Sequence, residues 1–285
     1  MPRIVIAGCG FIGLAAARLF HRASWQVLGV VSSAESAAAL ASEPFAVAPS
    51  DFTTRDAFDG LATWRDCEAV IHCASSGRGG ADTYRRVYLE GARNLIEGLR
   101  PDVLLFTSST SVYAQSSGEW VTEESAAEPE RETGRVLREA EQLMIERGGC
   151  VARLAGIYGP GRSVLLKKFL TGEAVIEDDG SRWINQAHRD DIAAALVRLV
   201  EASARGIFNV SDDTPMMQRA LYEGLAARLD RPLPPSGPID PNRKRGWTSK
   251  RVSNAKLRAL GWAPRFPSFF DAIANDPELL QAAGA

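Results

Sequence analysis

Three glycines near the amino terminus constrain the fold of this chain more than any other feature. They follow the apolar run Ile4–Ala7 in the spacing G-x-G-x-x-G, and a largely apolar helical pattern continues from there to Ala23. In a strand–turn–helix unit, glycines at this spacing allow a tight turn, a close approach of the backbone to a pyrophosphate, and close packing of the helix on the strand. The helix N-terminus adds unpaired N–H groups that favour phosphate. The sequence therefore predicts a nicotinamide dinucleotide bound by Gly8, Gly10, Phe11, Ile12 and Gly13, in preference to a strand–helix turn without a ligand.

The rest of the first half alternates short apolar runs with helical patterns. Runs predicted as strands lie at 27–31, 45–47, 69–72, 103–106 and 151–154, and predicted helices lie at 35–42, 56–64, 81–100 and 136–147. Strands that are apolar on both faces and separated by helices indicate a parallel sheet covered on both sides. Right-handed crossovers make such a sheet doubly wound, with ligands at the carboxyl ends of its strands. We therefore predict an α/β fold: a Rossmann-type doubly wound parallel sheet with a smaller C-terminal substrate lobe.

The pattern changes after Gly159-Pro160-Gly161. A helical segment follows, then a hairpin with strands at 175–176 and 183–184, and then another helix from Asp190. We predict that residues 1–162 form the dinucleotide-binding domain and that 188–210 return to it. Residues 163–187 and 211–285 then form the smaller, substrate-binding lobe over the cofactor cleft.

Composition limits the partners of the chain. With 33 Lys and Arg against 35 Asp and Glu, the net charge is −2, which argues against a nucleic-acid partner. No apolar stretch approaches the roughly 18 residues that a membrane span needs, and the strand that follows Met-Pro-Arg directly argues against a signal peptide. The four cysteines have no metal-like spacing. We expect a cytoplasmic protein with a small-molecule substrate, and no membrane, nucleic-acid or metal partner.

The end of the second predicted strand bears on which dinucleotide is bound. It reads Val30-Val31-Ser32-Ser33, with no acidic residue before Glu35. Sheets that prefer NAD usually carry Asp or Glu there, on the adenosine ribose. Nothing here would repel a 2′-phosphate, and the hydroxyls of Ser32 and Ser33 could bind one, although no neighbouring arginine is present to clamp it. We favour NADP as the cofactor and keep NAD as the alternative.

Five further segments, in order along the chain, carry a resemblance to a known family. They are 69–74, 106–113, 152–161, 188–192 and 206–212. Together with the glycine-rich turn they resemble the extended short-chain dehydrogenase/reductase group, in its NAD-dependent epimerase/dehydratase family. That family usually spaces its first glycines as G-x-x-G-x-x-G, so the spacing here is that of an atypical subgroup.

The resemblance implies roles for several residues at the ends of the predicted strands. Asp51 and Phe52 would border the adenine, and Cys73, Ala74 and Ser75 would line the nicotinamide ribose. The segment from Leu154 to Gly156 would form the floor under the nicotinamide. Ser109 falls on the family's catalytic Ser/Thr position, which hydrogen-bonds the reacting oxygen of the substrate.

One departure from the family concerns its catalytic Tyr-x-x-x-Lys motif. Alignment on Ala140-Glu141 places Thr133 at the tyrosine position and Leu137 at the lysine position. A phenol works as an acid or base near neutral pH only when neighbouring cations lower its pKa. Threonine does not titrate usefully, and leucine brings no charge. The catalytic candidates that remain are Ser109, Tyr113 and Thr133.

Two other tyrosines, Tyr84 and Tyr88, lie four residues apart on one helix face. This spacing is more typical of packing or of an interface than of catalysis.

Two functions stay open at this point. The first is an NAD(P)-dependent oxidoreductase or epimerase that acts on a small polar, sugar-like substrate without the usual Tyr/Lys pair. The alternative is a non-catalytic NADP-binding sensor or regulatory protein. The resemblance also implies a homodimer, because the helices at 81–100 and near Val136 resemble those that form a four-helix interface in relatives.

Overall fold

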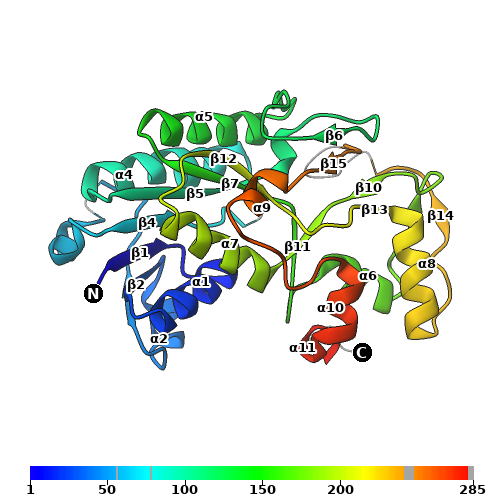
Figure 1. Cartoon of the computed structure of the whole chain (residues 1–285), viewed down its shortest axis with the longest axis horizontal. Helices are drawn as coiled ribbons and strands as arrows, with labels where there is room; N and C mark the ends of the chain where they lie inside the picture. Colours follow the sequence, from blue (N-terminus) through cyan, green and yellow to red (C-terminus); the bar gives the residue numbers. More distant parts are fainter. Residues whose placement is uncertain (56, 78, 241–246, 282–285) are drawn as a thin grey trace.

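The core of the protein is a seven-stranded parallel sheet (Figure 1). The computed structural model describes residues 1–55, 57–77, 79–240 and 247–281. The strand order is β12-β7-β5-β4-β1-β2-β3. The strands are β1 Arg3–Ala7, β2 Gln26–Val31, β3 Ala46–Pro49, β4 Ala69–His72, β5 Val103–Ser109, β7 Cys150–Leu154 and β12 Gly206–Val210. The chain builds outward from β1 in one direction and then restarts at β4 in the other. This order confirms the predicted Rossmann-type fold, and it places a topological switch point between β1 and β4.

Helices cover both faces of the sheet, as Figure 1 shows. On one face lie α1 (Phe11–Arg22), α2 (Ala34–Ala39) and α7 (Arg189–Glu201). On the other lie α4 (Gly91–Gly98) and α5 (Glu132–Glu146), with the short α3 (Ala81–Tyr84) and the π-helix η2 (Arg85–Glu90) leading into α4.

Alternate residues of the central strands enter different hydrophobic clusters. In β1, Ile4 and Ile6 pack under α1 and α7, whereas Val5 and Ala7 pack under α4 and α5. Both faces of the strand are therefore buried, which explains why its sequence is continuously apolar.

A smaller lobe has its own hydrophobic cluster, on the right of Figure 1. Its helices are α6 Val164–Leu170, α8 Gln218–Leu229, α10 Phe269–Asn275 and α11 Pro277–Gln281, while α9 Ala255–Ala259 packs against β12. Short strand pairs join the lobes or decorate the smaller one: β8 Gly156–Tyr158 with β11 Gln186–His188, β6 Trp120–Val121 with β15 Arg251–Val252, β9 Ile176–Glu177 with β14 Ser236–Gly237, and β10 Trp183–Ile184 with β13 Met216–Met217.

The prediction of a hairpin at 175–184 is wrong. The turn itself forms, since Gly180 N–H donates to the carbonyl of Glu177 at 2.9 Å. Its two strands do not pair with each other, because β9 pairs with β14 in parallel and β10 pairs with β13. Two backbone hydrogen bonds hold the segment to the start of α8 instead: the N–H of Gln218 donates to the carbonyl of Arg182, and the N–H of Arg219 donates to the carbonyl of Gly180. Each of the two strands therefore pairs with a strand distant in sequence and not with its neighbour.

Two predicted helices differ in kind from what was expected. The helix at 81–100 is present, but its middle is the π-helix η2 and it ends at Gly98. The helix at 56–64 is the 3-10 helix η1, Asp59–Trp64, and Asp56 lies outside the described residues.

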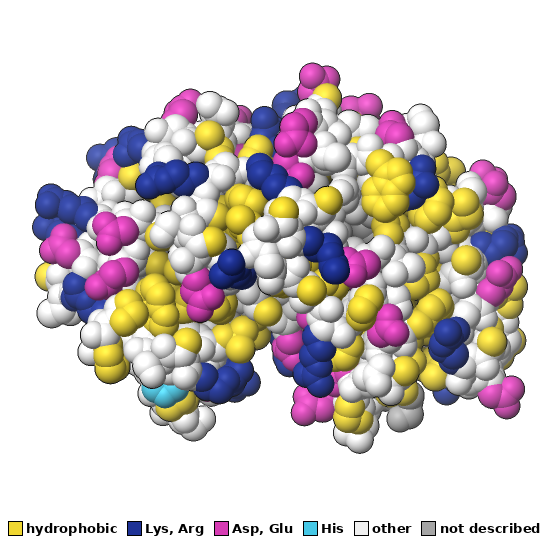
Figure 2. Space-filling model, in the orientation of Figure 1, with side chains coloured by type: hydrophobic (Ala, Val, Ile, Leu, Met, Phe, Trp, Pro, Cys, Tyr) yellow, Lys and Arg dark blue, Asp and Glu magenta, His cyan; other side chains and the backbone are white. Residues whose placement is uncertain are grey.

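The surface mixes charges of both signs. Lys and Arg side chains alternate with Asp and Glu over the face seen in Figure 2, and apolar patches lie between them. Within the described ranges no helix combines the length and the apolarity that a membrane crossing requires.

Candidate active site

The glycine-rich turn connects β1 to α1 at the carboxyl edge of the sheet. Gly8 has a φ of +96°, and a Cβ placed on it would lie 2.3 Å from the backbone N and Cα of Ala74. A Cβ on Gly13 would lie 2.2 Å from the carbonyl oxygen of Gly8. A Cβ on Gly10 would meet none of the described residues within 4 Å. The fold itself thus requires Gly8 and Gly13, whereas the space beside Gly10 is open for a ligand.

That open space belongs to a cavity of about 760 Å³, a size typical of small-molecule and cofactor sites. One half lies over the ends of β2 and β3, and the other over the ends of β4, β5 and β7. Both halves meet at the uncapped N-terminus of α1, where no side chain accepts the first N–H groups. The cavity therefore has the extended shape and the anion-favouring centre that a dinucleotide requires.

Most residues predicted to bind the cofactor lie on the cavity wall. They are Gly8, Gly10, Phe11, Ile12, Ser32, Asp51, Phe52, Cys73, Ala74, Ser75 and Leu154, with Ser109 among the catalytic candidates. Three are not part of the wall. Gly13 supports the turn from behind, Ser33 uses its hydroxyl to cap α2 by accepting the N–H of Ser36 at 3.1 Å, and Gly156 lies in β8 against the carbonyl of Asn185.

Ser109 ends β5, beside Leu154 of β7. Its Oγ accepts the N–H of Ser111 at 3.2 Å, which starts the 3-10 helix η3, Thr110–Val112. Within the described part of the chain no acceptor takes the hydroxyl hydrogen of Ser109. That hydrogen is available to a ligand in the cavity.

Tyr113 does not reach the cavity. Its side chain is fully buried, and its hydroxyl donates to Oδ1 of Asn209 at 2.9 Å. The guanidinium of Arg153 lies 4.7 Å from its ring centroid. Burial raises the pKa of Tyr113 despite that cation. The interpretation of Tyr113 as a replacement acid is therefore corrected: it is a packing residue with a satisfied hydroxyl.

Helix α5 presents an apolar side chain to the cavity. Leu137 lines the cavity and is 4% exposed, while Thr133 is not on the wall. The two thiols on the cavity wall do not serve as an acid or base near neutral pH, because burial raises the pKa of both Cys9 and Cys73 to about 12. The structure thus does not bring Thr133 into the site.

Several polar wall residues were not predicted from the sequence, among them Ser36, Thr83, Arg86 and Arg162. Tyr84 and Tyr88, considered above as packing residues, are also on the wall. The position of these two tyrosines depends on the course of the helix at 81–98, which residue spacing alone does not reveal.

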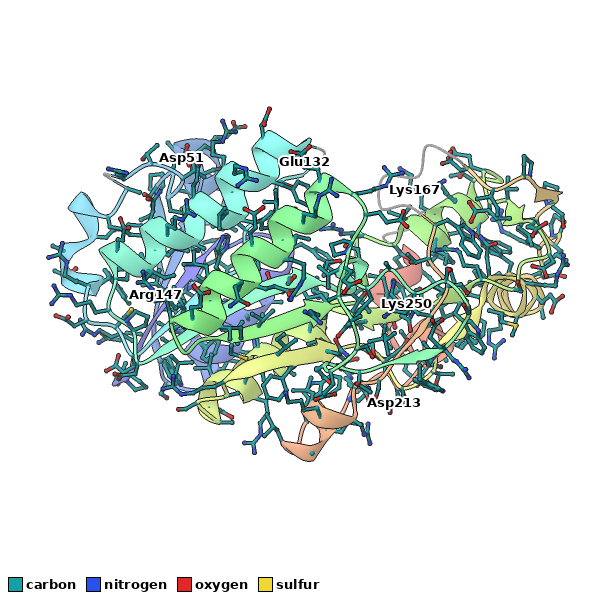
Figure 3. All side chains as sticks on the ribbon, turned by 90° about the horizontal axis from the view of Figure 1, so that it is seen from above. Asp51, Glu132, Arg147, Lys167, Asp213 and Lys250 are labelled. Carbon is teal, nitrogen blue, oxygen red and sulfur yellow. The ribbon has the colours of Figure 1, made fainter. Side chains whose placement is uncertain are left out.

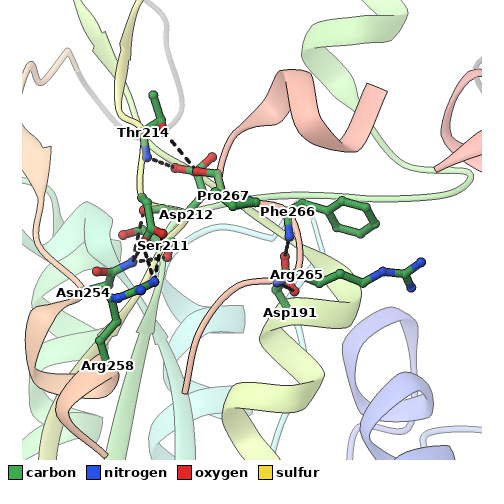
Figure 4. A network of polar contacts seen from close by, with 10 residues as sticks. Asp191, Ser211, Asp212, Thr214, Asn254, Arg258, Arg265, Phe266 and Pro267 are labelled. Atoms are coloured by element: carbon green, nitrogen blue, oxygen red, sulfur yellow. Dashed lines mark hydrogen bonds and ion pairs between the residues drawn. The ribbon is translucent and has the colours of Figure 1, made fainter. Parts of the chain in front are cut away.

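The two lobes are joined at the start of α7. His188 caps this helix through Nδ1, and its Nε2 lies 3.0 Å from Oδ2 of Asp276. The carboxylate of Asp191 accepts the N–H groups of Arg265 at 2.6 Å and Phe266 at 3.1 Å (Figure 4). His188 therefore has a structural role between the two lobes.

Figure 3 shows that two charged residues named here lie on different lobes. Asp51 lies on the sheet domain, whereas Lys167 lies on the other lobe. Lys167 is exposed on α6 and is not on the cavity wall.

Comparison with known proteins agrees with this geometry. The sequence profile of the NAD dependent epimerase/dehydratase family matches residues 4–211. Protein YeeZ of Escherichia coli K12 is 28% identical over 246 residues, which is 80% of this chain and 84% of that protein.

Solved structures show the same fold. A putative NAD-dependent epimerase/dehydratase from Methylobacillus flagellatus superposes with a TM-score of 0.80 at 29% identity, covering 100% of this chain and 99% of the other. The UDP-glucose 4-epimerase of Thermotoga maritima, solved with UDP-glucose, superposes with a TM-score of 0.80 at 17% identity and full coverage of both chains. With a glycine-rich turn, a doubly wound sheet and a family profile that spans most of its length, this chain belongs to the NAD-dependent epimerase/dehydratase family.

Proposed function

We propose that this protein binds a nicotinamide dinucleotide in the cavity at the Gly8–Gly13 turn and uses it as an oxidoreductase or epimerase on a small polar, sugar-like substrate. The observation that carries the proposal is the open space at Gly10, between an adenosine half with Ser32 and Asp51 and a half with Cys73, Leu154 and Ser109. When bound, the cofactor would supply or accept a hydride at its nicotinamide ring. Ser109 Oγ would hold the reacting oxygen of the substrate.

Relatives support a sugar-type substrate. The Thermotoga maritima protein is described as a UDP-glucose 4-epimerase, and a dTDP-glucose 4,6-dehydratase of Bacillus anthracis, solved with NAD, superposes with a TM-score of 0.78 at 13% identity, covering 99% and 100% of the two chains. Both are similar to this chain in fold.

Calorimetric titration of the purified protein with NADPH, NADP, NADH and NAD tests the proposal first. We expect clear binding of at least one of them. Turnover of a panel of sugars and nucleotide sugars is then measured with the bound cofactor. Absence of binding for all four dinucleotides would remove the proposed function.

One observation favours a second function, a non-catalytic NADP-binding sensor. The cavity presents Leu137 where the family has lysine, and Thr133 is off the wall. Dinucleotide binding without turnover of any panel substrate would support the sensor and exclude the enzyme on those substrates.

We propose NADP as the preferred dinucleotide. Ser32 lines the adenosine half and is exposed, and β2 ends without an acidic side chain there. We expect Ser32→Asp to weaken NADPH binding by about tenfold, roughly 1.4 kcal/mol, through repulsion of the 2′-phosphate, and to leave NADH binding nearly unchanged. Calorimetry measures both affinities.

Ser33→Asp is the matched control for this prediction. It adds the same charge one residue away, off the cavity wall, and an aspartate can still cap α2. Equal losses of NADPH and NADH affinity in Ser32→Asp would contradict the preference for NADP.

We also propose that the protein is a homodimer through α4 and α5. A groove between these helices is lined by Leu89, Arg93, Arg138 and Leu143, among others. Solution scattering is expected to give twice the mass of the chain at micromolar concentration. Leu143→Glu, which places a charge in the groove, is expected to halve that mass, and a monomeric wild type would refute the dimer.

A further inference from the structure

The helix at 81–98 widens into a π-helix where it borders the cavity. Residues Arg85–Glu90 have this geometry, between α3 and α4. Extended π-geometry is uncommon, and π-turns occur frequently at functional sites. The carbonyl of Val87 lies 3.0 Å from Nε2 of the buried His72. Burial lowers the pKa of His72 to about 4, so the ring is neutral near pH 7 and its Nε2–H donates to that carbonyl. His72 thus gives a carbonyl of the widened turn a partner outside the helix.

The next residue, Tyr88, lies on the cavity wall. Its ring stacks near that of His72, with centroids 6.2 Å apart, and meets the edges of Tyr84 at 5.0 Å and Phe106 at 6.1 Å. These rings on helix, β4 and β5 fix the phenol in one orientation. Tyr88 is half-buried, with one side open to the cavity.

The hydroxyl of Tyr88 accepts a hydrogen bond, but its own hydrogen has no acceptor among the residues that the structure describes. The N–H of Ser76 donates to Tyr88 Oη at 3.2 Å. Across the described ranges no protein atom accepts the Oη–H hydrogen. Two features follow: the hydrogen is free for a ligand, and a negative charge on Oη would be stabilised by a backbone N–H.

The phenol oxygen of Tyr88 is placed by its contact with Ser76, directly after the segment Cys73–Ser75. The ring contacts His72 of β4 and Phe106 of β5, although His72 also contacts Phe52, with ring centroids 5.3 Å apart. Ser109 ends the same strand that carries Phe106. Tyr88 and Ser109 therefore line one cavity, and Oη lies beside the segment that the proposed function assigns to the nicotinamide ribose.

We propose that Tyr88 is the proton-carrying residue of this site, in place of the tyrosine that α5 lacks. The inference rests on the proposed function and names the residue that performs its proton step. In the reducing direction, a substrate carbonyl needs a hydride at its carbon, which a bound cofactor would supply, and a proton at its oxygen. Tyr88 Oη releases its proton to the carbonyl oxygen, which has taken the π-bond pair, and keeps the O–H electron pair itself. Water then returns a proton to Oη, so that one hydride and one proton convert a carbonyl to an alcohol.

Tyr88→Phe tests this, with Tyr222→Phe as the matched control. Tyr222 lies on α8 in the smaller lobe, stacked near Phe169 at 6.1 Å and away from the cavity wall. We expect Tyr88→Phe to unfold at nearly the same temperature as the wild type and to keep its dinucleotide affinity within about threefold. Its turnover should fall by about 10²- to 10⁴-fold on any panel substrate that the wild type converts. Tyr222→Phe should match the wild type in dinucleotide affinity and in turnover.

A second readout does not depend on finding a substrate. An oxidised nicotinamide ring carries a positive charge, and a charge beside a phenol shifts the near-ultraviolet absorption band of that phenol. Adding NAD or NADP is therefore expected to change the tyrosine absorbance in the wild type and in Tyr222→Phe, and to change it much less in Tyr88→Phe. Tyr113 and Tyr158 are buried and are not on the cavity wall, so these two contribute little to the signal.

The outcomes separate the two proposals. If no dinucleotide binds to the wild type, the proposed function fails, and the inference fails with it. If the wild type turns over a substrate and Tyr88→Phe does so equally well, only the inference fails. The wild type could also bind a dinucleotide without turnover. In that case, an absorbance change in Tyr88→Phe equal to that of the wild type overturns the role of Tyr88. Loss of the absorbance change in Tyr88→Phe supports the placement of Oη beside the nicotinamide.

Discussion

Replacing Glu141 by Gln is expected to lower the free energy of unfolding by about 3–5 kcal/mol, the usual cost of breaking a buried ion pair. Glu141 is fully buried on α5, and Arg153 of β7 is 1% exposed. Arg153 donates from Nε at 3.0 Å and from Nη2 at 2.7 Å, and Ser108 Oγ donates to the same carboxylate at 2.6 Å. The loss of the carboxylate charge leaves a buried guanidinium uncompensated. Urea denaturation measures the effect.

The same helix supplies the control. Glu139 pairs with Arg85 at 2.9 Å, but both side chains are about half exposed, at 47% and 44%. Glu139→Gln is therefore expected to cost less than about 1 kcal/mol. A double variant, Glu141→Leu with Arg153→Met, should recover most of the stability lost in Glu141→Gln, because it removes both charges. Similar losses for Glu139→Gln and Glu141→Gln would show that the buried pair is no stronger than the exposed one.

This pair also anchors the end of β5 to helix α5. Ser108 precedes Ser109, and the hydroxyl of Ser108 donates to the carboxylate of Glu141. Leu137, one turn before Glu141 on α5, brings no charge to the cavity. The buried pair of Glu141 and Arg153 therefore holds the strand that carries Ser109 without taking part in the cavity wall.

The sheet and the cofactor turn could be predicted from the sequence because their signals are local. Ile4–Ala7, the glycine spacing and the helix after it lie within a short stretch, and a parallel sheet crossed by helices has few allowed topologies. The small strands β9 and β10 could not be paired, because their partners lie tens of residues away, in β14 and β13.

The reacting end of the site was harder to predict for a related reason. Ser109 was named from the resemblance to the family, but Tyr113, on the same segment, points into the core toward Asn209. Tyr88 reaches the cavity from a π-helix held by His72, and no residue pattern in 85–90 signals that geometry. Helical spacing alone assigned Tyr88 to packing, since its role depends on contacts with β4 and β5.

Replacing Gly10 by Ala is expected to weaken dinucleotide binding by about tenfold to a hundredfold, about 1.4–2.7 kcal/mol, while changing the free energy of unfolding by less than about 1 kcal/mol. Gly10 has a φ of −101°, on the side that other residues adopt, and its Cβ would meet no protein atom within 4 Å. The added methyl group would instead occupy the space where the backbone approaches the pyrophosphate. Calorimetry and thermal unfolding measure the two effects separately.

Gly8→Ala gives the opposite contrast at the same turn. Its φ of +96° strains any side chain, and its Cβ would lie 2.3 Å from the backbone of Ala74, so β1 and the segment after β4 must move apart. We expect a loss of about 3 kcal/mol or more in stability, together with loss of binding. If Gly8→Ala were destabilising and Gly10→Ala bound NADPH as tightly as the wild type, the turn would be a packing device alone. A selective loss of binding in Gly10→Ala can arise only if a ligand, and not the fold, needs that glycine.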